Sequence, residues 1–324
     1  MRILVFLFLT LGLAAGPSAA VAQKGAFGEV KQLQSPQDPT IGFMIQAGTN
    51  VIAKGAMTPE KEKEIRAKLE EIVLAGFKAL KDGKSSVEAV ELAVKMLEDS
   101  PLFVPDGKNE LDASIMDGKT LNAGSVASVH RVRNPITLAR AVMEKTSNVM
   151  LAGDGAEKFA REQKIEFVDE AAKGDRPKPA ADPAAVNGKS VSVGAVALDR
   201  KGNIAAGSSS GGISNGRPGR VSEAAVIGAG TYARNDTCGV SGSGWGEYFL
   251  RLGVARDMSS VMEYQALPIQ TAADRVIKQK LQRAGGSGGI IAIDKLGNMA
   301  MSFNTDGMYR AYINSEGKAV VEIY

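Results

Sequence analysis

Ser192 has the residue type and the neighbours that would suit a nucleophile. It directly precedes an apolar segment, 193–198, with the character of a buried strand, and three consecutive serines follow at 208–210. Two charged residues, Arg220 and Glu223, come next, after a glycine-rich turn. A serine hydroxyl becomes a strong nucleophile only when a base with a pKa near the working pH takes its proton. The alternative interpretation is an ordinary serine at a strand edge, so the base must be sought in the rest of the chain.

The usual bases and metal ligands are scarce. The chain has one histidine, His130, and one cysteine, Cys238. A Ser-His-Asp triad would depend wholly on His130, which also fits a basic residue at a helix edge. A zinc site needs several Cys or His ligands, so we predict no metal site of that kind. Cys238 cannot form an intrachain disulfide, and we expect it to be a small buried residue.

The α-amine of Ser192 offers a different base. If the peptide bond between Val191 and Ser192 were cut, Ser192 would carry a free amine with a reference pKa of about 7.7 to 8.0, against about 10.4 for a lysine. One residue would then supply both the nucleophile and the base, and no histidine would be needed. The segment before this bond, 171–189, is mainly Ala, Pro, Lys and Asp and is predicted to be a surface linker.

The N-terminus predicts export. Arg2 is followed by an apolar run at 3–13 and a small-x-small motif at 20–22, the pattern of a signal peptide spanning 1–22. The run is shorter than the roughly 20 residues of a membrane span, although a retained anchor is the alternative. We therefore expect a secreted or periplasmic protein with no membrane contact in its mature form. The formal charge of +3, without a dense basic run and with 5% aromatic residues, argues against nucleic acid as a partner.

Apolar periodicity predicts the elements that must position Ser192. In the first half, we expect one helix from Pro59 up to Asp82-Gly83, one capped by Ser85 or Ser86 and carrying apolar residues to Leu97, one from Asn134-Pro135 to at least Met143, and one at 155–163. Strands are expected at 41–45, 109–118, 121–132 and 149–151. In the second half, a hairpin at 194–206 shares the pattern A-(L/I)-D-(R/K)-x-G-N-x-A with a second one at 288–300, and helices are expected at 246–255 and 271–281. These elements predict a layered α+β architecture with mainly antiparallel sheets.

Several motifs, in order along the chain, resemble the plant-type L-asparaginase and isoaspartyl peptidase (beta-aspartyl-peptidase) family of N-terminal nucleophile hydrolases. The resemblance covers most of residues 41–311. The motifs that carry it are NELDASIMDG, RVRNPITLARAVMEKT, GDGAEKFA, VSVGAVALD, GNIAAGSSSGGISN, PGRV, GAGTYARND, SGSGWGE, GGSGGIIAID and FNTDGMYRA.

The resemblance implies a fold and a maturation step. The family's fold implies a four-layer αββα sandwich, formed as one domain from two chains after autoproteolysis. The α part would span 23–191, with a linker at about 170–190, and the β part would span 192–324. Two such αβ units are expected to pair as a homodimer.

Each implied role falls on a numbered residue. Ser192 replaces the family's nucleophilic threonine, and Ser210 is expected to hydrogen-bond near it. Ser243 and the backbone of Gly244 match the oxyanion donors, which stabilise a tetrahedral intermediate.

Two charged residues match the substrate-binding groups. Arg220 matches the arginine that holds the substrate α-carboxylate, a task suited to a bidentate guanidinium. Glu223 stands where the family has an aspartate that holds the α-amine. The implied activity is hydrolysis of the side-chain amide of L-asparagine or of β-aspartyl (isoaspartyl) dipeptides, both small molecules.

Five positions differ from the family pattern and leave other hypotheses open. Val191 replaces a Gly or Asp, Gln46 opens a changed early loop, and 104–108 is shorter than the sodium-binding loop, so no cofactor is expected. A catalytically impaired relative that binds an amino acid or a protein is the main alternative. A third hypothesis is a hydrolase that acts on a different amide substrate, because Glu223 is longer than the expected aspartate and Trp245 is bulkier than the usual residue.

Overall fold

The computed structural model describes residues 41–49, 53–103, 110–168, 192–212 and 217–324. All of these residues belong to one compact unit, Gln32–Tyr324. The predicted signal peptide, the linker, Val191 and the loop at 104–108 lie outside the described residues. The division into an α part and a β part therefore stays a prediction.

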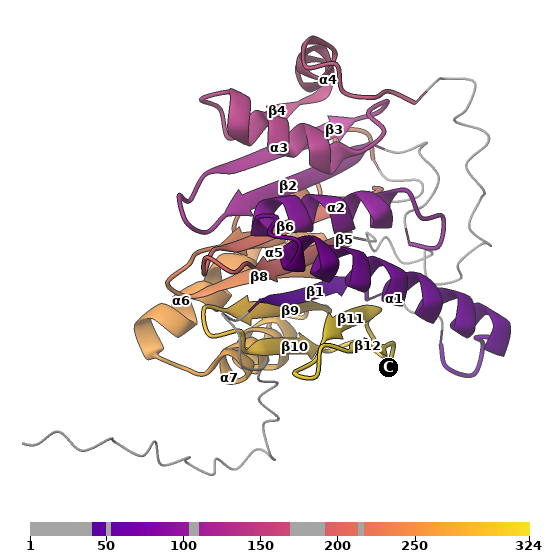
Figure 1. Ribbon diagram of the computed structural model, residues 1–324, viewed down its shortest axis with the longest axis vertical. Helices are drawn as coiled ribbons and strands as arrows, with labels where there is room; N and C mark the ends of the chain where they lie inside the picture. The colour runs from indigo at the N-terminus through magenta and orange to yellow at the C-terminus, as the bar shows by residue number, and fades with distance from the viewer. Residues whose placement is uncertain (1–40, 50–52, 104–109, 169–191, 213–216) are drawn as a thin grey trace, which may run out of the picture. The chain divides into compact units, whose positions relative to one another are not determined.

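Two β-sheets form the framework (Figure 1). The larger has the order β12-β11-β1-β5-β6-β2-β3-β4 and the smaller has the order β10-β9-β8-β7. The strands of the larger sheet are β1 (Gly42–Gln46), β2 (Leu111–Asp117), β3 (Ala123–Val129), β4 (Met150–Ala152), β5 (Ser192–Leu198), β6 (Ile204–Ser210), β11 (Arg310–Ile313) and β12 (Ala319–Glu322). Those of the smaller sheet are β7 (Thr231–Ala233), β8 (Cys238–Gly244), β9 (Gly288–Asp294) and β10 (Met299–Phe303). Among these strands only β3 and β4 pair in parallel, so the predicted α+β class with mainly antiparallel sheets is confirmed.

The helices of the first half begin where the sequence predicts. Thr58 caps α1 (Pro59–Lys81) by accepting a hydrogen bond from a backbone N–H in the first turn. Ser85 and Glu88 form a capping box at the start of α2 (Ser86–Glu98). Helices α3 (Pro135–Lys145) and α4 (Gly153–Glu162) follow the expected positions closely.

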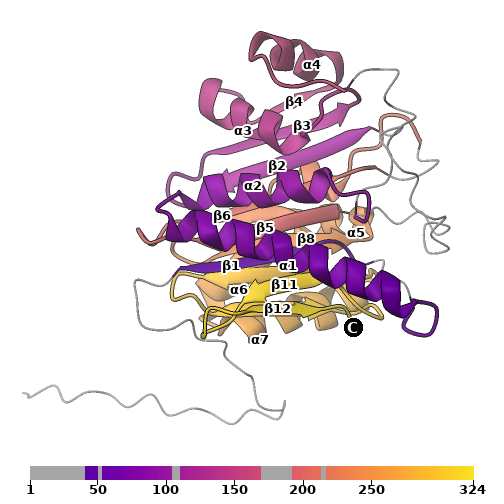
Figure 2. The ribbon, with the colours of Figure 1, turned by 45° about the vertical axis from the view of Figure 1, so that its right-hand side comes forward.

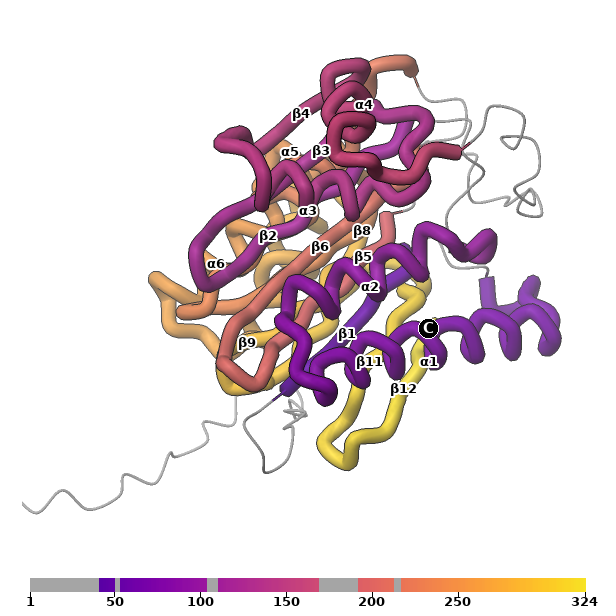
Figure 3. The backbone as a smooth tube through the Cα atoms, turned by 45° about the horizontal axis from the view of Figure 1, so that its top comes forward, coloured from indigo at the N-terminus to yellow at the C-terminus, as the bar shows by residue number. Residues whose placement is uncertain are grey.

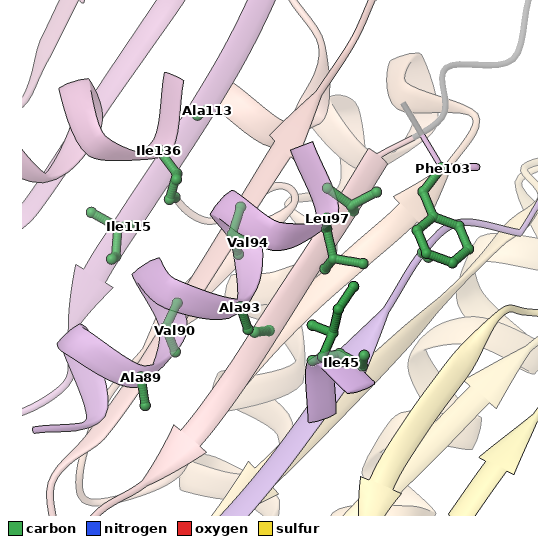
Figure 4. Packing of buried hydrophobic residues seen from close by; sticks show 14 of the residues in the cluster. Ile45, Ala89, Val90, Ala93, Val94, Leu97, Phe103, Ala113, Ile115 and Ile136 are labelled. Carbon is green, nitrogen blue, oxygen red and sulfur yellow. The ribbon is translucent and has the colours of Figure 1, made fainter. Parts of the chain in front are cut away.

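Helices α1, α2 and α3 cover the larger sheet (Figure 2). The apolar side of α2, including Val90, Val94 and Leu97, points toward Ile45 of β1 and Ile115 of β2 (Figure 4). Burying side chains of this size stabilises the fold by about 1.5–3 kcal/mol each. Within the part of the chain that the structure describes, none of the helices combines the length and apolar character of a membrane span.

The smaller sheet has its own helices. They are α5 (Gly246–Leu252), α6 (Val254–Gln265), α7 (Ile269–Asp274) and a π-helical turn at Arg275–Leu281. The prediction of helices at 246–255 and 271–281 was close, but it missed α6 as a separate helix. Gly253 ends α5 and separates it from α6. Its φ of 59° is in the left-handed region, which glycine adopts without strain.

The strand β5 shows how the larger sheet divides its two faces. Val193, Ala195 and Ala197 belong to the core on the helix side, while Val196 and Leu198 belong to the core that also contains residues of the smaller sheet. This alternation is the period of two that a strand buried on both faces requires. The β5–β6 hairpin runs beside α2 along its length (Figure 3). Ser192, at the start of β5, therefore lies on the face that meets the smaller sheet.

Candidate active site

The face of the larger sheet that meets the smaller sheet becomes polar at the end where β5 begins. Ser192 is paired with Ser210 on β6, and Ser210 is paired with Asp112 on β2. Residues directly opposite each other on neighbouring strands point their side chains to the same face. All three are nearly or fully buried. The predicted nucleophile and the predicted Ser210 thus share one row of side chains.

Ser192 makes two hydrogen bonds to other predicted site residues. Its Oγ donates to Glu223 Oε1 at 2.6 Å, and its backbone N donates to Ser243 Oγ at 3.3 Å. Ser192, Glu223 and Ser243 have no exposed surface. The larger sheet supplies Ser192, the smaller sheet supplies Ser243, and a short 3-10 helix between β6 and β7 supplies Glu223, so only the fold brings the three together.

Asp112 holds the short 3-10 helix η3 (Glu223–Ala225), in which Glu223 stands. Its carboxylate accepts hydrogen bonds from the backbone N of Ser222 at 2.7 Å and of Ser128 at 3.0 Å. Two serine hydroxyls hold the rest of η3. Ser114 of β2 donates to the backbone carbonyl of Ala224, and Ser125 of β3 donates to that of Ala225. Sequence reasoning gave Asp112 no role, although it stands in the NELDASIMDG motif.

Burial makes the carboxyl of Glu223 easier to protonate. It raises the pKa of Glu223 from 4.5 to about 7. The hydrogen bond from Ser192 and the charge of Arg220 favour the ionised form, while the charge of Asp112 opposes it. Burial also raises the pKa of Asp112. A carboxyl with a pKa near neutrality can exchange a proton with a neighbouring group at physiological pH.

Two buried polar atoms beside the predicted nucleophile have no hydrogen-bond partner. Arg220 donates from Nε to Glu247 Oε1 at 2.8 Å, but its Nη2 is unpaired, as is Glu223 Oε2. A side chain at Gly246 would collide with both of these atoms, so both lie next to the same glycine. Buried polar atoms without partners are uncommon and call for an explanation. A ligand with an acceptor for Arg220 and a donor for Glu223 would satisfy both.

Ser243 and Gly244 end strand β8, opposite Gly289 and Gly288 of β9. A Cβ on Gly244 would overlap the carbonyl of Ser287 and the Cα of Gly288, so only glycine fits there. The next residue, Trp245, donates from its backbone N to the same Ser287 carbonyl at 2.8 Å and is 41% exposed. The contact between Ser243 and Ser192 places the predicted oxyanion pair beside the nucleophile, while its role in binding an oxyanion stays a prediction.

A buried polar network behind the nucleophile escaped sequence reasoning. Gln46 donates from Nε2 to Ser241 Oγ at 3.3 Å and accepts at Oε1 from the backbone N of Gly48 at 2.8 Å. The hydroxyls of Ser208 and Ser241 are 2.8 Å apart, which links the two sheets. The sequence presented Gln46 only as the start of a changed loop. Its side-chain partner Ser241 is 195 residues away in sequence, so no local signal could have identified this contact.

Two residues weighed at the sequence level have structural roles. The backbone N of His130 donates to Glu157 Oε1 at 2.9 Å, and the residue is exposed. Cys238 is fully buried, as expected, and burial raises its pKa to about 12, which makes the thiol unreactive. Among the described residues, no group of three or more His, Cys, Asp or Glu side chains is placed to hold a metal ion.

Comparisons with known proteins cover the whole of this site. A family model described as asparaginase matches residues 39–323, a range that contains every site residue named above. The chain is 41% identical over 292 residues to the isoaspartyl peptidase of Salmonella typhimurium, covering 83% of this chain and 93% of the relative. It is also 41% identical over 292 residues to the isoaspartyl peptidase of Escherichia coli, covering 83% and 91%. The plant-type L-asparaginase of Pyrococcus abyssi is 38% identical over 294 residues, covering 81% and 95%.

Proposed function

Because the chain belongs to the asparaginase family of N-terminal nucleophile hydrolases, we propose that it hydrolyses the side-chain amide of L-asparagine, of β-aspartyl (isoaspartyl) dipeptides, or of both. The observation that carries this proposal is the position of the two unpaired polar atoms. Arg220 Nη2 and Glu223 Oε2 lie beside a buried serine that is hydrogen-bonded to Glu223. An α-carboxylate and an α-amine on one substrate carbon would give each of these atoms a partner.

The chemistry follows from that binding mode. Ser192 Oγ attacks the side-chain amide carbon of the substrate, and ammonia or an amine leaves. Ser243 and Gly244 stabilise the oxyanion of the intermediate, and Ser210 supports the nucleophile from the opposite strand. An aspartyl ester of Ser192 remains, and water cleaves it to aspartate and free enzyme.

Maturation, export and assembly belong to the same proposal. The chain cleaves itself between Val191 and Ser192, works outside the cytoplasm after losing residues 1–22, and pairs as a homodimer of αβ units. The four-layer αββα arrangement is supported by three separate hydrophobic cores: helices on the larger sheet, sheet against sheet, and the smaller sheet against its helices. The alternative of an impaired binding protein is not favoured, since the relatives named above are described as enzymes.

Intact mass and ammonia release test the proposal together. The purified wild type should convert into two chains that meet at Val191-Ser192, and should release ammonia from L-asparagine or an amino acid from a β-aspartyl dipeptide. An α-aspartyl dipeptide and L-glutamine serve as control substrates. A chain that stays intact on long incubation and releases nothing would contradict the proposal. A preference for another amide would instead assign a different substrate, for which the exposed Trp245 is the first residue to vary.

A variant of Arg220 tests the binding mode. Arg220→Lys should raise KM by about tenfold or more, because an ammonium cannot reproduce the planar guanidinium contact with a carboxylate. Arg217, an exposed arginine three residues earlier, provides the matched control Arg217→Lys. Equal KM values for the two variants would contradict the assignment of Arg220.

A further inference from the structure

The hydrogen bond between Ser192 and Glu223 is not explained by substrate binding. The Oγ–Oε1 distance of 2.6 Å lies in the range of a charge-assisted bond from a hydroxyl to a carboxylate. Both side chains are fully buried, so bulk water does not compete for either atom. A residue that only held the substrate α-amine would have no need to contact the nucleophile.

Two other groups that the sequence offers, the α-amine of Ser192 and His130, are unsuited to accept the proton of Ser192 Oγ before the chain is cleaved. The backbone N–H of Ser192 points to Ser243 Oγ, and a nitrogen in a peptide bond has no basic lone pair. His130 is exposed and its backbone is bound to Glu157, on α4. The α-amine becomes available as a base only after the bond to Val191 is broken, so that first cleavage needs another acceptor.

We propose that Glu223 is a catalytic residue that accepts the proton of Ser192 Oγ as this oxygen attacks a carbonyl carbon. The inference rests on the proposed function and adds a carboxylate base to it. The O–H bond of Ser192 breaks, its proton moves to Glu223 Oε1, and Oγ bonds to the carbonyl carbon. The C–N bond then breaks, the nitrogen leaves with the proton from Glu223, and water hydrolyses the ester to restore the hydroxyl. The same steps apply to the 191–192 peptide bond and to a substrate amide.

The surroundings of Glu223 suit this exchange. Arg220, next to Glu223 Oε2, favours the carboxylate and is itself paired with Glu247 of α5. Asp112 of β2 opposes it by like charge, and burial opposes it more strongly. The resulting pKa of about 7 leaves the group ionised in most molecules above neutral pH, yet basic enough to take a proton.

The length of the side chain explains the contact. The resemblance places aspartate at this position, and aspartate is shorter than glutamate by one methylene, or about 1.5 Å. From the same backbone position an aspartate would fall short of the 2.6 Å contact that Glu223 makes. Glu223 thus uses one oxygen for the nucleophile and leaves the other, Oε2, next to Arg220.

Self-cleavage takes place without substrate, so its rate distinguishes a Glu223 that acts as a base from a Glu223 that only binds substrate. Purified wild type, Glu223→Gln and Glu98→Gln are incubated between pH 5 and 9, and the fraction cleaved at Val191-Ser192 is followed by intact mass. Glutamine has nearly the same shape but cannot accept the proton. Glu98 is a second buried glutamate with a raised pKa and lies outside the site, so its variant controls for the loss of a buried carboxyl. Thermal unfolding of each variant checks that the chain is folded.

We expect Glu223→Gln to slow self-cleavage by about 100-fold or more, the usual contribution of general base catalysis. The wild-type rate should rise with pH through about 7, and this inflection should disappear in Glu223→Gln but persist in Glu98→Gln. If Glu223→Gln cleaves within about threefold of wild type and keeps the inflection, the inference is overturned while the proposed function stands. If wild type neither cleaves itself nor releases ammonia, both are overturned.

Discussion

The hairpins β5–β6 and β9–β10 have the same turn but different surroundings. In each, an aspartate at the turn, Asp199 or Asp294, accepts hydrogen bonds at Oδ1 from the backbone N–H groups two and four residues later. The first hairpin lies in the middle of the larger sheet, and the second lies in the smaller sheet. Counting back seven residues from each aspartate reaches Ser192 in one hairpin and Ser287 in the other.

The two serines differ in what packs against them. Ser192 is fully buried, with Glu223 on its hydroxyl and Ser243 on its backbone N. Ser287 is partly exposed, and its carbonyl accepts the backbone N–H of Trp245. The repeated sequence therefore encodes the turn and the strands, whereas the proposed chemistry depends on residues from elsewhere that cover the open end of one hairpin.

The largest expected effect is the difference in activity between alanine variants of these two serines. Ser192→Ala should abolish self-cleavage and lower amide hydrolysis by about 1,000-fold or more, because the nucleophile is lost. Ser287→Ala is the matched change in the other hairpin and should cleave itself at close to the wild-type rate. Intact mass and ammonia release measure both. Loss of activity in both variants alike would show that the two hairpins are not functionally distinct.

The next largest effect is expected from removing Asp112, which holds the 3-10 helix that carries Glu223. Asp112→Ala leaves two backbone N–H groups, those of the buried Ser222 and the partly buried Ser128, without their acceptor. We expect the unfolding free energy to fall by about 3 kcal/mol and hydrolysis to fall by about tenfold beyond any loss of folded protein. Urea unfolding and kcat measured on the folded fraction check the two effects. An unchanged kcat would show that η3 keeps Glu223 in place without Asp112.

Alanine variants of the two turn aspartates should differ in unfolding free energy by a smaller amount. Asp199 also accepts a hydrogen bond at Oδ2 from the backbone N of Ser86 at 3.0 Å, which ties the hairpin to the start of α2. Asp294 uses Oδ2 for Asn298 of its own turn. Urea unfolding should give a loss of about 3 kcal/mol for Asp199→Ala and about 1–2 kcal/mol for Asp294→Ala. Equal losses would contradict a role of the contact with α2 in stability.

The pH dependence of stability is a separate prediction, and it concerns the two buried glutamates on opposite faces of the first hairpin, Glu98 and Glu223. Glu98, on the helix face beside Ser209, has its pKa raised from 4.5 to about 8 by burial. As pH rises from about 4.5 to 8, the unfolded chain releases this proton before the folded chain does, so stability falls. Glu98→Gln should make the unfolding free energy decline less over this range, with the remaining slope due partly to Glu223. Urea unfolding at pH 5, 6.5 and 8 measures it, and an unaltered slope would contradict the raised pKa.

The local elements could be predicted because their signals are local. Thr58 and Ser85 marked helix starts, and the apolar periods of α1 and α2 gave their buried sides. The repeated turn motif gave both hairpins. The boundary at Gly253 was missed because a single glycine inside a helical pattern is also tolerated in a continuous helix.

The sequence by itself determined which residues are candidates for the active site. With one histidine and one cysteine in the chain, and with motifs in family order, it predicted Ser192, Arg220, Glu223 and Ser243 as site residues. Only the tertiary structure decided how they meet. Glu223 contacts Ser192 across 31 positions and Ser192 contacts Ser243 across 51, because two sheets and a short 3-10 helix converge there. Burial, which no local pattern specifies, then raises the pKa of that carboxyl toward neutrality.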